Sequence, residues 1–156
     1  MPLLLVCCLF YFAYEAEARV DAVSEHPNLI VRVNAYRWGW QFAYAGGPVV
    51  GGSTHSPILS SPVAPPPELV LPVNRTTRIE LTSSDVTHSF WVPDFLFKRD
   101  AIPGQMTAFD LEPNRLGSFP GRCAQFCGFD HAYMTFRVRV VSVADFAVWL
   151  RRAAKP

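Results

Sequence analysis

The sequence predicts an all-β domain, an antiparallel sandwich or barrel with Greek-key connections, with a short apolar helix before it and a short amphipathic helix after it. The chain has 156 residues, which is the length of one domain or of one domain with a short anchor. Fourteen prolines and nine glycines weigh against a helical bundle and suit short strands separated by turns. Half of the residues are hydrophobic and only 17% are charged, so the chain can bury a core.

The charge balance excludes one class of function. Lys and Arg number 14 and Asp and Glu 13, which gives a formal net charge of +1, and the basic residues are not gathered into a run. Domains that bind nucleic acid usually carry a basic patch or stripe. We therefore expect no nucleic-acid partner.

The N-terminal segment Pro2–Tyr14 contains no charged residue, although it is shorter than the roughly 20 residues that a membrane-spanning helix needs. Ala16-Glu17-Ala18 has the form of a signal-peptide cleavage site, but no basic residue precedes the apolar run. We favour a partial transmembrane helix or anchor over residues 1–18. The domain over residues 19–156 would then lie outside the cytoplasm or on the membrane surface.

A period-two pattern follows a charged connector at Glu15–Pro27 and predicts one strand over Asn28–Tyr44. Aromatic residues of one parity would line one face of this strand, where we expect most of them to meet the core: Tyr36, Trp38, Trp40, Phe42 and Tyr44. Residues 45–67 are rich in Gly and Pro and predict a long surface loop within the same domain.

The second half of the chain predicts short strands punctuated by prolines: Leu69–Val73, Thr76–Ser83, Ser89–Phe97, Met106–Leu111 and Thr135–Val143. The run Ser142-Val143-Ala144-Asp145 has the form of a capping box. We therefore expect a short amphipathic helix that ends at about Ala153.

The segment Gly121–Phe136 carries the residues with distinctive chemistry. Cys123, Cys127, His131 and Met134 follow the spacing Cys-x3-Cys-x3-His-x2-Met. Thiolate, imidazole and thioether together favour copper, because zinc has little use for methionine. A second imidazole would have to come from elsewhere, and His88, just before a predicted strand, is our candidate.

Four kinds of site are compatible with these residues. Cys123 and Cys127 could form a disulfide, which leaves His131 and Met134 unexplained. The cysteines and His131 could hold a structural zinc with His88 as the fourth ligand. A one-copper electron-transfer site needs a single cysteine, whereas a two-copper centre with bridging thiolates uses every residue present. The sequence has no catalytic triad, phosphate loop or haem-attachment motif, so we expect no catalysis by this chain alone.

From about Val20 to its C-terminus the chain resembles subunit II of the haem–copper cytochrome c oxidases. The matching pieces occur in the family's order: Arg37–Phe42 (RWGWQF), Asp85–Pro93 (DVTHSFWVP), Lys98–Gln105 (KRDAIPGQ) and Gly121–Met134 (GRCAQFCGFDHAYM). Nitrous-oxide reductase has a similar copper domain, but the Trp-x-Trp and AIPG pieces favour the oxidase. The resemblance implies a cupredoxin-like β-barrel carrying a dinuclear CuA centre on the outer, periplasmic face of a prokaryotic plasma membrane.

The resemblance also implies a role for each residue. The cysteines would bridge two copper ions, each histidine would bind one copper, and a methionine sulfur and a backbone carbonyl would be weak ligands. Trp38 would receive the electron from cytochrome c. The electron would pass to haem a in catalytic subunit I, where oxygen is reduced and protons are pumped. The implied metal ligands are His88, Cys123, Gln125 through its carbonyl, Cys127, His131 and Met134.

Two departures from the family pattern matter. Gln125 stands where the family usually has a Glu whose side chain helps to bind magnesium at the contact with subunit I. A neutral amide is a poorer ligand for a hard cation, so the magnesium site is in question here. Family members begin with two transmembrane helices, whereas this chain begins within what resembles the second.

Docking of cytochrome c in this family uses acidic surface around the copper loop. The candidates in this sequence are Asp85, Asp94, Asp110, Glu112 and Asp130. Arginines are interspersed among them, so an ordinary surface of mixed charge is the alternative. The alternative to an oxidase subunit is a copper-binding or copper-delivery protein that works without an oxidase partner.

Overall fold

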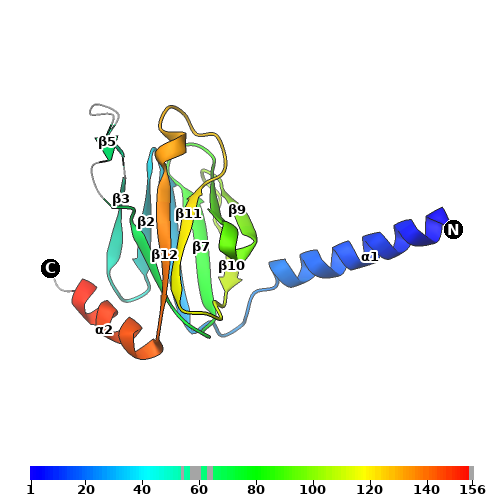
Figure 1. The fold of residues 1–156 in the computed structure, drawn as a ribbon, viewed down its shortest axis with the longest axis horizontal. Helices are drawn as coiled ribbons and strands as arrows, with labels where there is room; N and C mark the ends of the chain where they lie inside the picture. The colour runs from blue at the N-terminus through cyan, green and yellow to red at the C-terminus, as the bar shows by residue number, and fades with distance from the viewer. Residues whose placement is uncertain (54, 57–60, 63–64, 155–156) are drawn as a thin grey trace.

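The computed structural model describes residues 1–53, 55–56, 61–62 and 65–154. Strands of two five-stranded sheets form the domain, with one helix at each end of the chain (Figure 1). The first sheet has the order β10 (Thr107–Leu111), β7 (Thr77–Ser83), β1 (Leu29–Tyr36), β2 (Gly39–Tyr44) and β3 (Val49–Ser53). The predicted cupredoxin-like all-β fold is confirmed.

The second sheet carries the segments from the C-terminal half. Its order is β6 (Glu68–Pro72), β12 (Thr135–Val141), β11 (Gly117–Cys123), β8 (His88–Val92) and β9 (Phe97–Ala101). The neighbours within the two sheets are antiparallel except for the pairs β1/β7 and β6/β12, which are parallel. The sandwich is therefore mixed, not purely antiparallel as the short strands and turns predicted.

The core between the sheets is built from aromatic rings. Phe136 of β12 stacks on Phe90 of β8, with 4.7 Å between ring centroids, and lies 4.9 Å from Trp40 of β2. Phe109 of β10 contacts Phe90 from the other sheet at 5.8 Å. Because these rings come from distant parts of the sequence, their burial fixes how the two sheets face each other.

The predicted strand over Asn28–Tyr44 is wrong in one respect, since it is a hairpin of two strands. The chain turns at Arg37–Trp38, whose peptide bond is cis, and β2 runs back along β1. Gly39, the first residue of β2, permits close packing on β3, because a Cβ atom there would lie 2.7 Å from the Gly52 carbonyl oxygen. The single aromatic face is therefore broken: the three aromatic side chains on β2 are buried, whereas Tyr36 and Trp38 are half-buried.

The predicted strand over Ser89–Phe97 is also two strands. Pro93 begins the short 3₁₀ helix η1 (Pro93–Phe95), because its ring fixes φ and removes an N–H donor. Leu96 then adopts a left-handed conformation with φ 52°, and the chain returns as β9, antiparallel to β8.

Strand β11 lacks a sequence prediction, because its glycines and proline are typical of turns. A Cβ atom at Gly121 would lie 2.3 Å from the ring of Phe136, so glycine is the residue that lets this core ring pack against the strand. The predicted loop over 45–67 contains strand β3 and the short pair β4 (His55–Ser56) and β5 (Ser61–Pro62). Residues 54, 57–60 and 63–64 of that prediction lie outside the described residues.

The C-terminal helix α2 (Val143–Ala153) confirms the capping-box prediction. The Ser142 hydroxyl accepts a hydrogen bond from the Asp145 backbone N–H at 3.1 Å. Trp149 lies 4.9 Å from the ring of Tyr44, so the helix covers the end of the sandwich where β2 finishes.

The N-terminal helix α1 (Pro2–Asp21) projects away from the strands (Figure 1). It continues through the first part of the predicted connector, where Glu15 and Arg19 form an exposed ion pair one helical turn apart. None of its residues is buried. In the described part of the chain, no helix combines the length and the apolar character that crossing a membrane requires.

Candidate metal centre

Strand pairing gathers the predicted ligands at one end of the sandwich. Cys123 is the last residue of β11, and Met134 immediately precedes β12. The loop that begins at Cys123 and ends at Met134 therefore also holds Cys127 and His131. His88 is the first residue of β8, which pairs with β11 so that Phe90 lies opposite Cys123. The fold therefore brings together residues that are 35 positions apart.

The candidate ligand atoms form one continuous group. The Sγ atoms of Cys123 and Cys127 lie 3.8 Å apart, and both cysteines are free thiols. His88 Nδ1 lies 3.7 Å from Cys123 Sγ, and His131 Nδ1 lies 3.4 Å from Cys127 Sγ. Met134 Sδ lies 3.8 Å from Cys127 Sγ. One histidine therefore flanks each cysteine.

The carbonyl oxygen of Gln125 completes this group, 3.2 Å from Cys123 Sγ. The two ends of the loop are tied by a hydrogen bond from the Cys123 N–H to the Met134 carbonyl at 2.9 Å. The N–H of Ala124 also donates to the Ser89 carbonyl at 3.1 Å, which ties the loop to β8. These backbone bonds position the part of the main chain that carries the donor atoms.

Most of the candidate ligands are shielded from water, whereas His131 is partly buried. His88 is fully buried, and the exposed fraction is 5% or less for Cys123, Cys127 and Met134. His88, Cys123 and Cys127 offer ligand atoms that all lie within 4.8 Å of one another, a grouping that could hold a metal ion. Two sulfur atoms from thiols, two imidazoles and a thioether are soft or borderline donors, which fits copper.

Asp85 positions His88 and was not predicted for this role. Its Oδ1 atom lies 2.9 Å from His88 Nε2, so the other ring nitrogen, Nδ1, faces the sulfurs. Burial raises the pKa of Asp85, but hydrogen bonds from His88, from the Val86 N–H and from the Arg37 N–H outweigh it and lower the pKa to about 2. A carboxylate that binds the far nitrogen of a metal-ligating histidine is a common supporting arrangement. The sequence signal was an Asp three residues before the His.

The two thiols differ in acidity. Burial raises the pKa of Cys123, but hydrogen bonds from His88 and from the backbone at Gln125 and Ser89 lower it by more. Burial and the neighbouring negative charge of Cys123 raise the pKa of Cys127 to about 12. The metal-free pair therefore holds one proton more tightly than the other, and metal binding must displace it.

Trp38 lies directly against the ligand loop. Its indole Nε1 donates a hydrogen bond to the Cys127 carbonyl at 3.2 Å. A Cβ atom at Gly128 would lie 3.2 Å from the indole ring, and the φ of Gly128 is +115°, so glycine permits this close approach. The turn between β1 and β2 thus reaches the loop between β11 and β12.

The comparison with protein families decides what kind of domain this is. A sequence model described as cytochrome c oxidase subunit II, periplasmic domain, matches residues 63–141. The chain belongs to the cytochrome c oxidase subunit II family. The matched range includes His88 and the whole loop between β11 and β12, whereas Trp38 lies before it.

Relatives of known name support this assignment. The chain is 36% identical to the probable cytochrome c oxidase subunit 2 of Streptomyces avermitilis over 188 residues, which cover 99% of this chain and 58% of the relative. It is 33% identical to cytochrome c oxidase subunit 2 of Corynebacterium diphtheriae, with 97% of this chain and 55% of the relative covered. The chain therefore spans somewhat more than half the length of these relatives.

Solved structures agree with the family. The crystal structure of the periplasmic domain of subunit II of cytochrome oxidase (CoxB) of Bradyrhizobium japonicum matches with a TM-score of 0.72 at 32% identity, covering 84% of this chain and 96% of that chain. A mixed disulfide intermediate between a thioredoxin-like protein and subunit II of cytochrome c oxidase matches with a TM-score of 0.67 at 30% identity, covering 86% and 96%.

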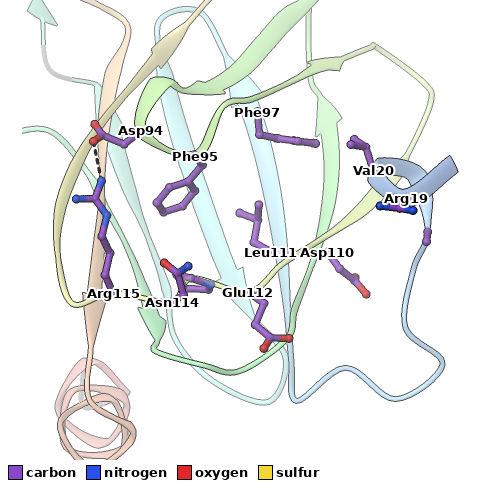
Figure 2. Close-up of a pocket in the computed structure, with 12 residues that line it drawn as sticks. Arg19, Val20, Asp94, Phe95, Phe97, Asp110, Leu111, Glu112, Asn114 and Arg115 are labelled. Atoms are coloured by element: carbon purple, nitrogen blue, oxygen red, sulfur yellow. Dashed lines mark hydrogen bonds and ion pairs between the residues drawn. The ribbon is translucent and has the colours of Figure 1, made fainter. Parts of the chain in front are cut away.

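The opposite end of this subunit II domain contains a separate cavity of about 380 Å³ (Figure 2). It lies between the C-terminal end of α1, where Arg19 is located, and the sandwich, and Phe95 and Leu111 line it. Asp94 pairs with Arg115 beside it at 2.9 Å. No described residue of its lining is Cys, His or Met, so it offers none of the soft donors found at the loop end.

The five acidic candidates for docking do not surround the ligand loop. Asp94, Asp110 and Glu112 line the cavity at the opposite end. Asp130 lies in the loop, but only 1% of it is exposed, and Asp85 is engaged by His88. The prediction of an acidic surface around the loop is therefore wrong for this chain.

Proposed function

We propose that this chain is the subunit of a bacterial terminal oxidase that accepts electrons from cytochrome c at a two-copper CuA centre. The electrons would pass to haem a of catalytic subunit I, where oxygen is reduced. The observation that carries the proposal is the convergence of two sulfurs, two imidazoles, a thioether and a carbonyl within contacts of 3.2 to 3.8 Å. Bound copper would supply reversible one-electron chemistry.

The role of the polypeptide would be to fix the positions of the donor atoms. Cys123 and Cys127 present their sulfurs toward each other, which suits two bridging thiolates, and His88 and His131 would each bind one copper. The remaining weak donors, Met134 and the Gln125 carbonyl, lie beside different cysteines. A donor set fixed by strand pairing and backbone bonds needs little rearrangement when the charge of the site changes.

Trp38 is our candidate for the point at which the electron enters. The hydrogen bond from its indole to the Cys127 carbonyl supports this role, because it connects the half-buried ring to a candidate ligand. The side chain of Gln125 is exposed and uncharged, and we propose no magnesium site on it.

We also propose where this domain works. Residues 19–156 would form the copper domain on the outer, periplasmic face of the plasma membrane, in contact with subunit I. Residues 1–18 would belong to a membrane anchor, which the exposed apolar side chains of α1 support. The family description and the bacterial relatives support a prokaryotic, periplasmic setting.

Metal content and electron paramagnetic resonance of the full chain loaded with copper test the proposal. Two copper ions per chain and a seven-line hyperfine pattern are expected, because the unpaired electron would be shared by two equivalent copper nuclei. One copper with a four-line pattern, or zinc alone, would contradict a CuA centre. Purification with a haem-containing partner is expected of an oxidase subunit and not of a stand-alone copper-delivery protein.

A further inference from the structure

The loop that holds the candidate ligands also exposes large aromatic side chains. The exposed fractions are 78% for Phe126, 84% for Phe129 and 53% for Tyr133, and we call these three residues the aromatic patch. Two exposed phenylalanines within four positions are unusual on a polar surface, and clustered exposed apolar groups mark interaction sites. Aromatic residues are also enriched where proteins bind one another.

The aromatic patch belongs to the loop that carries the candidate ligands, and one of its rings contacts a candidate ligand. The ring of Phe126 is 5.8 Å from the imidazole of His131. Phe129 follows Gly128, which packs against the indole of Trp38. A partner seated on the patch would therefore lie close to a candidate ligand and to the candidate point of electron arrival.

Among the described residues near the patch, acidic groups are not in excess. Asp130 is buried, and Asp85 is paired with Arg37, whose Nε lies 3.3 Å from Asp85 Oδ2. Asp100, the second-to-last residue of β9, is half-buried, and Arg122 lies over the ring of Trp91 with 5.9 Å to its centroid. The described charges at this end are therefore mixed in sign and partly withdrawn from the surface.

Acidic groups gather instead at the cavity end, where arginines already pair with them. Asp110 is bound by Arg78, and Asp94 by Arg115. A donor that recognises its partner through a ring of lysines would find its counter-charges at the wrong end of this domain. Charge complementarity therefore favours a donor with an uncharged contact face.

We propose that the electron donor docks on the aromatic patch beside Trp38, through a contact face that is apolar and nearly uncharged around its exposed cofactor edge. This inference rests on the proposed function, because it names the class of partner for the same site. Apolar docking brings the two surfaces into direct contact without counter-ions, so association depends little on ionic strength.

The test compares two probes on the full chain, both metal-free and copper-loaded. One probe is a cytochrome c whose haem edge is surrounded by uncharged residues, and the other is a cytochrome c whose haem edge is ringed by lysines. Binding is measured calorimetrically with both proteins oxidised, from about 20 mM to about 500 mM salt. We expect the uncharged probe to bind more tightly above about 100 mM salt and its affinity to change by less than about threefold, whereas electrostatically steered binding falls roughly tenfold or more.

The double substitution Phe126→Ser, Phe129→Ser should weaken binding of the uncharged probe at least about fivefold, as for aromatic anchors in other interfaces. The matched control, Leu96→Ser with Leu116→Ser, removes side chains that are 95% and 61% exposed outside the ligand loop and should leave binding unchanged. The copper spectrum of both variants should equal that of the unaltered chain.

Three outcomes would overturn the inference. The first is tight, salt-sensitive binding of the lysine-ringed probe that the phenylalanine substitutions leave unchanged. The second is equal weakening by the control variant. The third is loss of the haem-containing partner from the phenylalanine variant with donor binding intact, which would mean that subunit I covers the patch. Failure of the unaltered chain to form a two-copper spectrum contradicts the proposed function instead, and donor binding to the metal-free chain still tests the patch.

Discussion

The two ends of the β-domain differ in chemistry although they are built from the same strands. The end formed by the loop between β11 and β12 holds sulfur and imidazole groups, most of them buried, on a loop tied by backbone hydrogen bonds. The opposite end holds ion pairs between carboxylates and arginines, a cavity of about 380 Å³ and the C-terminal helix. One end is suited to binding a metal, and the other stabilises the chain.

This difference follows from where the chain reverses direction. At the loop end the connection after β11 is long enough to carry both cysteines, His131 and Met134, and the first residue of β8 adds His88. At the opposite end the short connections are closed by helix α2 and by polar pairs. Substitutions at the loop end should therefore change metal binding with little effect on stability, and substitutions at the opposite end should do the reverse.

The largest effect is expected for Cys123→Ser. Its sulfur lies 3.7 Å from His88 Nδ1 and 3.2 Å from the Gln125 carbonyl oxygen, so its loss removes one of two candidate bridges. We expect the two-copper spectrum to disappear, measured by copper content and electron paramagnetic resonance. The matched control is Cys7→Ser, because Cys7 is exposed on α1. An unchanged spectrum in Cys123→Ser would refute the ligand assignment.

Met134→Leu should separate tuning from binding. Leucine has nearly the same volume, so this buried site should lose less than about 1.5 kcal/mol of stability. If the thioether is a weak ligand, both coppers stay bound and the reduction potential shifts, which redox titration measures. A potential equal to that of the unaltered chain would mean that Met134 serves only packing.

The candidate ligands that the sequence singled out lie together in the structure, whereas several predicted strands have other bounds. Residue type and spacing indicated Cys123, Cys127, His131 and Met134, and His88 was the candidate for a second imidazole. The Gln125 carbonyl was implied only by the family resemblance. The contact of Asp85 with His88 was not predicted, because it depends on the orientation of the imidazole ring, which sequence spacing does not reveal. The prediction of an acidic docking surface was wrong for a similar reason, since tertiary contacts decide which carboxylates are exposed and which are paired.

The errors in the strands have local causes. β11 contains Gly121, which is typical of a turn but is required here by the ring of Phe136. The strand predicted over Asn28–Tyr44 reverses at Trp38, because the alternation of aromatics continues through a turn whose closure depends on contacts with other strands. Local pattern therefore identified the core residues and misjudged where the chain turns.

Tyr44→Phe should destabilise the end opposite the ligand loop. The buried Tyr44 hydroxyl accepts a hydrogen bond from the Val70 N–H at 2.7 Å and donates one to the Val70 carbonyl oxygen at 3.0 Å. Its removal leaves two buried backbone groups without this partner, at a cost of about 1–3 kcal/mol in chemical denaturation. Copper content should stay unchanged. A variant that loses copper before it loses stability would break the separation between the two ends.

Alkaline pH gives a second measure of the same hydroxyl. Burial raises the pKa of Tyr44 above its ordinary value, so the folded chain keeps this phenol protonated more strongly than the unfolded chain does. The stabilising contribution is fully present below about pH 10, the ordinary value for tyrosine, and declines as the pH rises further. The difference in unfolding free energy between the unaltered chain and Tyr44→Phe should therefore narrow above about pH 10.

Ser142→Ala should give the smallest effect. The Ser142 hydroxyl accepts from the Asp145 N–H at 3.1 Å and donates to the Asp145 carboxylate at 2.7 Å, so it caps the first turn of α2. Its loss should cost about 1 kcal/mol of unfolding free energy, whereas Ser142→Thr, which keeps a hydroxyl, should cost less. Because α2 covers the end of the sandwich distant from the ligand loop, the copper spectrum of both variants should match that of the unaltered chain. A changed spectrum in Ser142→Ala alone would show that the two ends are coupled through the core.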